Sequence, residues 1–194
     1  MDKGTSLEDV IRDYDELIEK TLGVVGAAKI YPKVFVKPEE KYLHPFFDRN
    51  LFNSLNQLDL VIGLKYLDIA RGTKRFHEAR YFAKVVATTS YEILRDLNQL
   101  VGKEIGSFIS ERLGAEALTD LDSSVREVAK IKKAYAESLG KIRHELLGHK
   151  LTNGLEQSKQ LEALNIKTIY TVGKRIFYAQ NKVLLNMTEL INRI

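Results

Sequence analysis

Apolar residues along this chain recur mainly at steps of three and four, the spacing of one face of an α-helix. The clearest series lies in residues 124–147 and consists of Val125, Val128, Ile131, Tyr135, Leu139, Ile142 and Leu146. A capping box is expected where this helix begins, with Ser124 as N-cap and Glu127 three residues later. Gly148 is expected to end it.

The same spacing predicts helices in the rest of the chain. They are expected at about 6–20, 50–69, 78–101, 104–113 and 166–194. A Pro-bearing irregular stretch at 31–47, a turn at "RGTKRF" and a polar linker at "KLTNGLEQSKQ" are expected between them. The prediction is an all-α, up-and-down bundle of four to five main helices, with the helices at 78–101 and 124–147 antiparallel.

The length of 194 residues suits one helical domain, in which residues 1–49 supply an N-terminal helix and the irregular segment, and 50–194 form the bundle. The absence of cysteine excludes disulfides and thiolate metal sites. No signal-peptide pattern is present, and the longest apolar run, "TLGVVGAAKI", falls short of the ~20 residues that span a bilayer. We therefore expect a cytoplasmic protein with no membrane association.

Positive charge is concentrated in the C-terminal third. Residues 126–150 hold seven Lys or Arg against three Glu, whereas the whole chain has a net charge of only +4. Such a concentration suggests an anionic partner such as RNA, DNA or a nucleotide. A solvated, lysine-rich helix face produces the same pattern.

The stretch "KIRHELLGHK" nearly matches the zinc-protease signature H-E-x-x-H but has one residue too many. His144 and His149 are five positions apart, so on a helix they point about 140° away from each other and cannot share one zinc ion. His44 and His77 have no carboxylate pair at metal-ligand spacing. We therefore expect neither a metal nor a cofactor.

The segment "RHELLGHK", residues 143–150, resembles the R-x(4–6)-H motif of the HEPN superfamily, most closely its abortive-infection branch. These small helical bundles include many metal-independent ribonucleases of bacterial and archaeal defence and toxin systems. "YEILRDLNQLVGK" is similar to the family's corresponding segment, and the resemblance covers about 50–190. His144 is a departure, because Asn or Asp is commoner there. A second match, "RGTKRFH" from Arg71 to His77, has no preceding amphipathic helix that would hold it.

The resemblance implies an endoribonuclease that uses the RNA 2′-hydroxyl as nucleophile and leaves a 2′,3′-cyclic phosphate. Arg143 would stabilise the charge on phosphorus, because its planar fork suits phosphate oxygens. His149 would act as general acid or base, with His144 supporting the site. Lys141 and Lys150 would contact RNA phosphates. The implied partners are RNA and a second copy of the chain in a homodimer with a composite site. A cognate antitoxin protein is a further candidate partner.

Helical geometry allows other interpretations of the roles of these residues. Arg143 and His149 would flank the apolar stripe some 120° apart on one continuous helix, so a break at Gly148 or a contribution from two chains is needed to bring them together. His149 also suits a core or interface position. Glu145 either orients the ring of His149 or pairs with Lys141 at i, i+4.

Two hypotheses compete with the nuclease. One is a non-catalytic HEPN bundle that binds a nucleotide or a partner protein, and the other is a purely structural helical oligomer. The tyrosines at helical spacing are interpreted mostly as core residues, among them Tyr66, Tyr81, Tyr91, Tyr135, Tyr170 and Tyr178.

Overall fold

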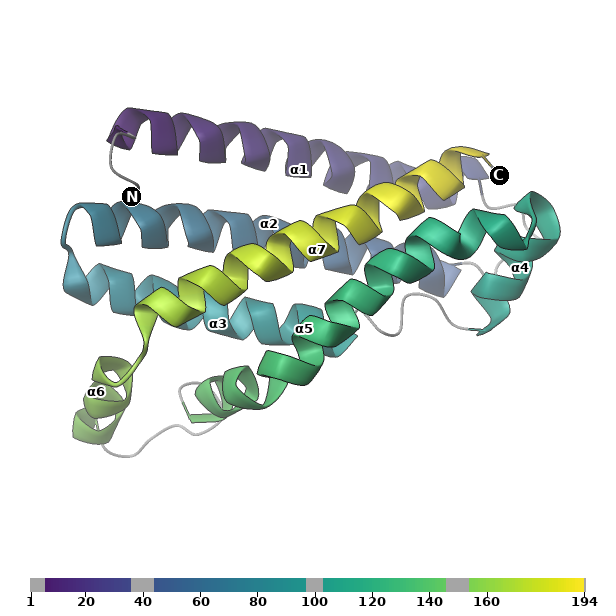
Figure 1. Ribbon diagram of the computed structural model, residues 1–194. Coiled ribbons are helices and arrows are strands. Elements are labelled where there is room, and N and C mark those ends of the chain that lie inside the picture. Colours follow the sequence, from purple (N-terminus) through teal and green to yellow (C-terminus); the bar gives the residue numbers. More distant parts are fainter. Residues whose placement is uncertain (1–5, 36–43, 97–102, 146–153, 194) are drawn as a thin grey trace.

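The computed structural model describes residues 6–35, 44–96, 103–145 and 154–193, and every regular element in these ranges is helical. The elements are α1 (Leu7–Phe35), α2 (His44–Gly72), α3 (Phe76–Asp96), α4 (Lys103–Leu113), the 3-10 helix η3 (Ala115–Leu118), α5 (Thr119–Arg143), α6 (Gly154–Glu162) and α7 (Ile166–Arg193). Five of them are long, and these alternate in direction from α1 to α7 (Figure 1). The all-α prediction is confirmed.

α7 runs diagonally across the bundle and contacts α2, α3 and α5 (Figure 1). It buries a complete apolar face, which includes Ile176, Val183 and Met187. Gly173 permits the close approach, since a Cβ there would lie 2.6 Å from Val86 Cγ1 and 3.1 Å from a Leu64 methyl group. One apolar cluster therefore joins residues of α1, α2, α3, α4, α5 and α7.

The predicted apolar stripe of α5 faces the core. Val128, Ile131 and Leu139 are buried, and Val125, Tyr135 and Ile142 pack partly against the same cluster. Leu146, the last predicted stripe residue, lies outside the described residues. Its antiparallel packing on α3 is also confirmed, because later residues of α5 contact earlier residues of α3. Lys132 reaches the carbonyl of Arg95, whereas Gly140, further along α5, lies against Tyr91.

The capping box predicted at Ser124 is wrong. η3 leads directly into α5, which begins earlier, at Thr119, without a side-chain cap. Ser124 is buried inside the helix, and its hydroxyl donates to the carbonyl of Leu121 at 2.8 Å. At the other end, the backbone N–H of His144 donates to the carbonyls of Gly140 and Lys141. The stop expected at Gly148 lies outside the described residues.

Two expected connections are helical in part. α1 continues through Pro32 to Phe35, and α2 begins at His44. Proline is tolerated in the first turn of a helix, where its missing N–H costs little, and Pro45 sits in the first turn of α2. The polar linker also contributes to α6. These segments were expected to be irregular because proline and polar residues are weak helix signals.

The tight turn predicted at "RGTKRF" is confirmed. Lys74 has a positive φ of 58°, and the N–H of Arg75 donates to the carbonyl of Ala70 at 2.8 Å. α4 likewise ends where expected, before Gly114, whose φ is 86°. None of the described helices has a stretch long and apolar enough to cross a membrane.

The tyrosines are less buried than the sequence suggested. Tyr66, Tyr81 and Tyr178 are exposed. The other tyrosines expected in the core, Tyr91, Tyr135 and Tyr170, are only partly buried. Helical spacing locates a ring on a face of its helix, but an amphipathic phenol often sits at the edge of that face.

Candidate functional site

Arg143, the first residue of the HEPN-like motif, is the last residue of α5 and is anchored to α3. Its Nε donates to Glu92 Oε1 at 2.8 Å, and its guanidinium carbon lies 5.8 Å from the centre of the Tyr91 ring. The side chain remains 40% exposed. Because this hydrogen bond uses Nε, Glu92 does not occupy the two terminal amino groups of the Arg143 guanidinium.

Glu92 is itself fixed by a second arginine. Its other carboxylate oxygen, Oε2, lies 2.6 Å from Arg95 Nη1. Arg95 also donates from Nε and Nη2 to the two oxygens of Asp96, at 2.7 and 2.9 Å. This paired hydrogen bond to Asp96 raises the pKa of Arg95 above its usual value. Each oxygen of Glu92 therefore faces a different arginine, which fixes the direction of the carboxylate toward Arg143.

Gly140 makes room for the aromatic ring beside Arg143. A Cβ at this position would lie 2.9 Å from Tyr91 Cε2, closer than real Cβ contacts. The Tyr91 ring therefore packs directly on the α5 backbone, one turn before Arg143. This contact and the Glu92 ion pair hold the end of α5 against α3.

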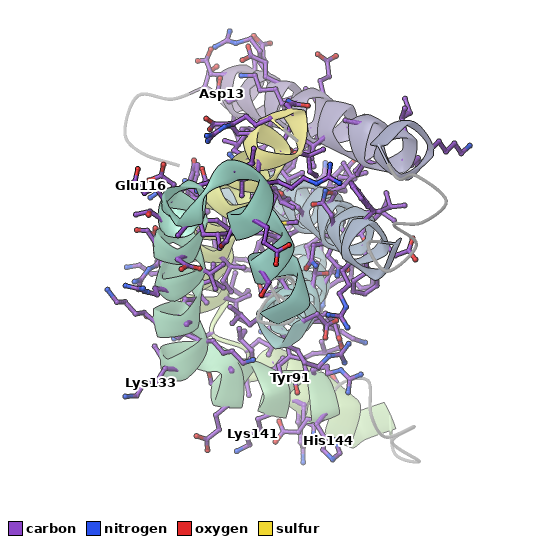
Figure 2. All side chains as sticks on the ribbon, turned by 90° about the vertical axis from the view of Figure 1, so that its right-hand side faces the viewer. Asp13, Tyr91, Glu116, Lys133, Lys141 and His144 are labelled. Atoms are coloured by element: carbon purple, nitrogen blue, oxygen red, sulfur yellow. The ribbon has the colours of Figure 1, made fainter. Side chains whose placement is uncertain are left out.

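Lys141 and His144 project from the same end of α5. Figure 2 shows both residues near Tyr91 at one end of the molecule, with Asp13 at the opposite end of the view. Lys141 Nζ lies 3.8 Å from Glu145 Oε1, so the predicted pairing of these two residues is confirmed. The His144 side chain is exposed.

The structure does not test the whole motif, because His149 and Lys150 lie outside the described residues. Within the described ranges, no group of three or more His, Asp or Glu side chains is arranged to hold a metal ion. The competing motif match was expected to have no preceding amphipathic helix, and this is wrong, because Arg71 lies in the last turn of α2. The match is nevertheless split between two elements, since His77 is exposed near the start of α3.

Arg71 belongs to a buried polar cluster that joins three helices. Its Nη1 lies 3.7 Å from Asp68 Oδ1, and its guanidinium carbon is 4.4 Å from the centre of the Tyr170 ring. Tyr170 donates its hydroxyl proton to Asp68 Oδ2 at 2.7 Å, so Tyr14, 3.2 Å away, donates to Tyr170. The chain of hydrogen bonds thus runs from α1 through α7 to α2.

Burial and these hydrogen bonds perturb both phenols. Burial, with the Tyr170 hydrogen bond, raises the pKa of Tyr14 well above its usual range. Burial also raises the pKa of Tyr170, to about 12, and the hydrogen bond to Asp68 adds to this effect.

The sequence analysis did not identify this cluster, because its members come from distant parts of the chain. The available signal was Asp68 at the buried face of α2, between the core positions Leu67 and Ala70. Carboxylates rarely lie fully buried without a specific partner.

Comparison with protein-family models, with curated proteins and with solved structures gives no match for this chain. The resemblance to HEPN proteins stays a prediction from the sequence of residues 143–150.

Proposed function

We propose that the C-terminal end of α5 belongs to a metal-independent endoribonuclease of HEPN type, acting in a prokaryotic defence or toxin system. The observation that carries the proposal is the arrangement of Arg143. Glu92 orients its guanidinium through Nε, Tyr91 flanks it, and the side chain is partly exposed at a helix end. A cation fixed in advance stabilises charge that develops on a phosphate more effectively than a mobile one.

In the proposed reaction, the 2′-oxygen of RNA attacks the neighbouring phosphorus and its proton passes to a base. The bond from phosphorus to the 5′-oxygen breaks, and that oxygen takes a proton from an acid. The products are a 2′,3′-cyclic phosphate and a 5′-hydroxyl. His149 is the proton carrier, Arg143 faces the phosphoryl oxygens, and Lys141 and Lys150 contact flanking phosphates. His144 supports the site.

The proposal includes a homodimer whose two motifs form one composite site. A twofold axis near 141–150 would bring Arg143 of one chain close to His149 of its partner, which one straight helix does not do. The exposed positions of Lys141 and His144 at one end of the bundle leave that surface available for such contact. Light scattering at tens of micromolar should give a dimer; a monomer would contradict the composite site.

The experiment that tests catalysis compares Arg143→Ala, His149→Ala and the double variant on mixed RNA. Groups that serve one transition state are not additive, so each single change should reduce cleavage nearly as much as the double change. The pH–rate profile should have a limb near the ordinary histidine pKa of about 6.5. RNA binding without cleavage by the wild-type protein would instead favour the non-catalytic HEPN bundle.

A further inference from the structure

Three aromatic side chains form a surface where α2 turns into α3. Tyr66 and Phe82 stack with their ring centres 5.2 Å apart and their planes at 19°, and Tyr81 meets Phe82 at 82° with centres 5.3 Å apart. Together with Ile69 and Arg75 these rings line a shallow hollow between the two helices. Tyr81 is 59% exposed and Tyr66 is 45% exposed. This aromatic surface is therefore open to solvent at both tyrosines.

The Tyr81 ring is able to stack on a flat group. Tyr81 and Phe82 meet nearly at right angles, so this contact covers at most one face of the Tyr81 ring. An exposed ring face is a surface on which an unpaired nucleic-acid base stacks, and such stacking contributes to binding with little dependence on sequence. A base inside a duplex is already stacked and paired. The aromatic surface therefore favours a single strand.

Positive charge surrounds the aromatic surface. Residues 74–84 hold four Lys or Arg against one acid, Glu78, whereas the whole chain has a net charge of only +4. Glu78 lies 3.4 Å from Arg75, and both side chains are at least half exposed, so this ion pair is weak. The other three cations have no ion-pair partner among the described residues: Lys74, Arg80 and Lys84. Such an excess of positive charge favours an anionic partner.

The cations are spread along α3. Lys84 lies about two turns, or about 12 Å, after Phe76, the first residue of α3. Lys74 and Arg75 lie before this start, in the turn. One phosphate group cannot contact cations spread over such a length, whereas successive phosphates of one strand can. The distribution of charge therefore favours a polynucleotide over a mononucleotide.

The face of α3 that carries Tyr81 leads to Arg143. Four residues follow one another at steps of three and four and so lie on one face of the helix: Tyr81, Lys84, Thr88 and Tyr91. Tyr91 is the ring beside Arg143, 5.8 Å from its guanidinium carbon. The turn between α2 and α3 and the C-terminal end of α5 lie toward the same end of the bundle (Figure 1). A strand that stacks on Tyr81 and continues along this face therefore reaches the proposed cleavage site.

We propose that the aromatic surface and the cations of residues 74–84 together bind single-stranded RNA. Unpaired bases stack on Tyr81, and Arg80 and Lys84 contact the phosphates. This role rests on the proposed nuclease function, because the strand held here is the one that Arg143 would meet. The substrate is then unpaired RNA, which the protein holds at a distance from the bond that it cleaves.

Fluorescence anisotropy of the full chain with a labelled, unstructured 2′-O-methyl RNA of about twelve nucleotides measures binding alone. Such a strand lacks the free 2′-hydroxyl that the proposed reaction needs. It should bind at least about tenfold more tightly than its duplex. No binding at tens of micromolar, or equal binding of the duplex, would overturn the proposal. Preferential binding of the single strand, without any cleavage of ordinary RNA, would support this surface and contradict the nuclease alone.

Three tyrosine variants locate the strand. Tyr81→Ala should weaken binding about tenfold, within the range for losing one stacked base, whereas Tyr81→Phe should stay within about twofold because the ring remains. Tyr178→Ala is the matched control and should also stay within about twofold. Tyr178 is a similarly exposed tyrosine on α7, in T-shaped contact with Phe177 at 5.5 Å. Equal loss in Tyr81→Ala and Tyr178→Ala would overturn the proposal.

The salt dependence of binding tests the phosphate contacts. Arg80→Gln should reduce the slope of log affinity against log salt by about 0.7, the loss of one phosphate contact to a single strand. Arg126→Gln, which changes an exposed arginine on α5, should leave the slope unchanged. If Tyr81→Ala instead lowers the oligomeric state in light scattering and leaves RNA binding intact, the surface is an interface between copies of the chain and the proposal is wrong.

Discussion

The end of α5 and the buried polar cluster that joins α1, α2 and α7 are built from the same three kinds of group. Each places an arginine beside a tyrosine ring and a carboxylate: Arg143 with Tyr91 and Glu92, and Arg71 with Tyr170 and Asp68. Each arginine is also the first residue of a match to the R-x(4–6)-H pattern. The chemical composition of the two regions therefore does not distinguish them.

Solvent exposure does distinguish them. The Arg143 side chain is 40% exposed and that of Glu92 is 20% exposed, so water screens their charges and the ion pair mainly sets direction. Asp68 and Tyr14 are buried, and the pKa of Tyr14 is raised mainly by this burial. The Arg71 side chain is 27% exposed and its Nη1 is buried beside Asp68, so Arg143 is the more accessible of the two arginines to a large polyanion.

The largest effect expected from this comparison is on RNA cleavage. Arg143→Ala should lower the cleavage rate by about 10³-fold, the usual cost of removing one fixed donor to a developing oxyanion. Arg71→Ala and His77→Ala should leave the rate within about twofold, because neither lies at the end of α5. Initial rates on one RNA, with melting curves for each variant, check this. A comparable loss in Arg71→Ala with native melting would move the site to the buried polar cluster.

A second test places one methyl group in each region. Gly173→Ala should lower the free energy of unfolding by about 1–3 kcal/mol, because the new Cβ meets Val86 and Leu64 inside the core. Gly140→Ala should cost less than about 1 kcal/mol, since the partly exposed Tyr91 ring can swing away, yet it should slow RNA cleavage by displacing that ring. Gly26→Ala in α1, where nothing lies within 4 Å, should stabilise by up to about 1 kcal/mol. Urea unfolding measures all three.

The buried cluster also predicts alkaline sensitivity. The folded-state pKa of Tyr170 is about 12 and that of Tyr14 is higher still, against about 10 in the unfolded chain. A raised pKa contributes stability below pH ~10 that is lost as the pH rises toward the folded-state value. Urea unfolding between pH ~9 and ~12 should therefore show a decline that is shallower in Tyr170→Phe. That variant should itself cost about 1–2 kcal/mol at neutral pH, because Asp68 loses a donor.

The smallest effect is expected for the exposed pair at the end of α5. Lys141 and Glu145 are 3.8 Å apart and largely in water, so Glu145→Gln should change the free energy of unfolding by less than about 0.5 kcal/mol. Lys141→Gln should be equally neutral for stability but should weaken RNA binding, particularly at low salt. A stability loss above 1 kcal/mol in either variant would mean that this end is packed more tightly than its exposure indicates.

Local patterns predicted the fold better than the sites. The apolar stripe of α5, the turn after α2 and the span of α7 were predictable because each depends on spacing within one segment. The beginning of α5 was not, because η3 leads directly into it, so the helix starts at Thr119 and Ser124 lies inside it.

Contacts between distant segments account for what the sequence did not reveal. Arg143 could be proposed from its motif, but its partner Glu92 lies 51 positions away. Tyr14 and Tyr170 are 156 positions apart, and each looks like an ordinary core tyrosine within its own helix. Only the packing of α1, α2 and α7 brings their hydroxyls together at Asp68.

Analysis of RNA product ends tests the central claim most directly. The wild-type protein, incubated with RNA and EDTA, should leave 2′,3′-cyclic phosphate and 5′-hydroxyl ends, whereas natively folded Arg143→Ala and His149→Ala should leave the RNA intact. Cleavage that disappears with EDTA, or that persists in His149→Ala, would contradict a metal-independent site built on Arg143 and His149.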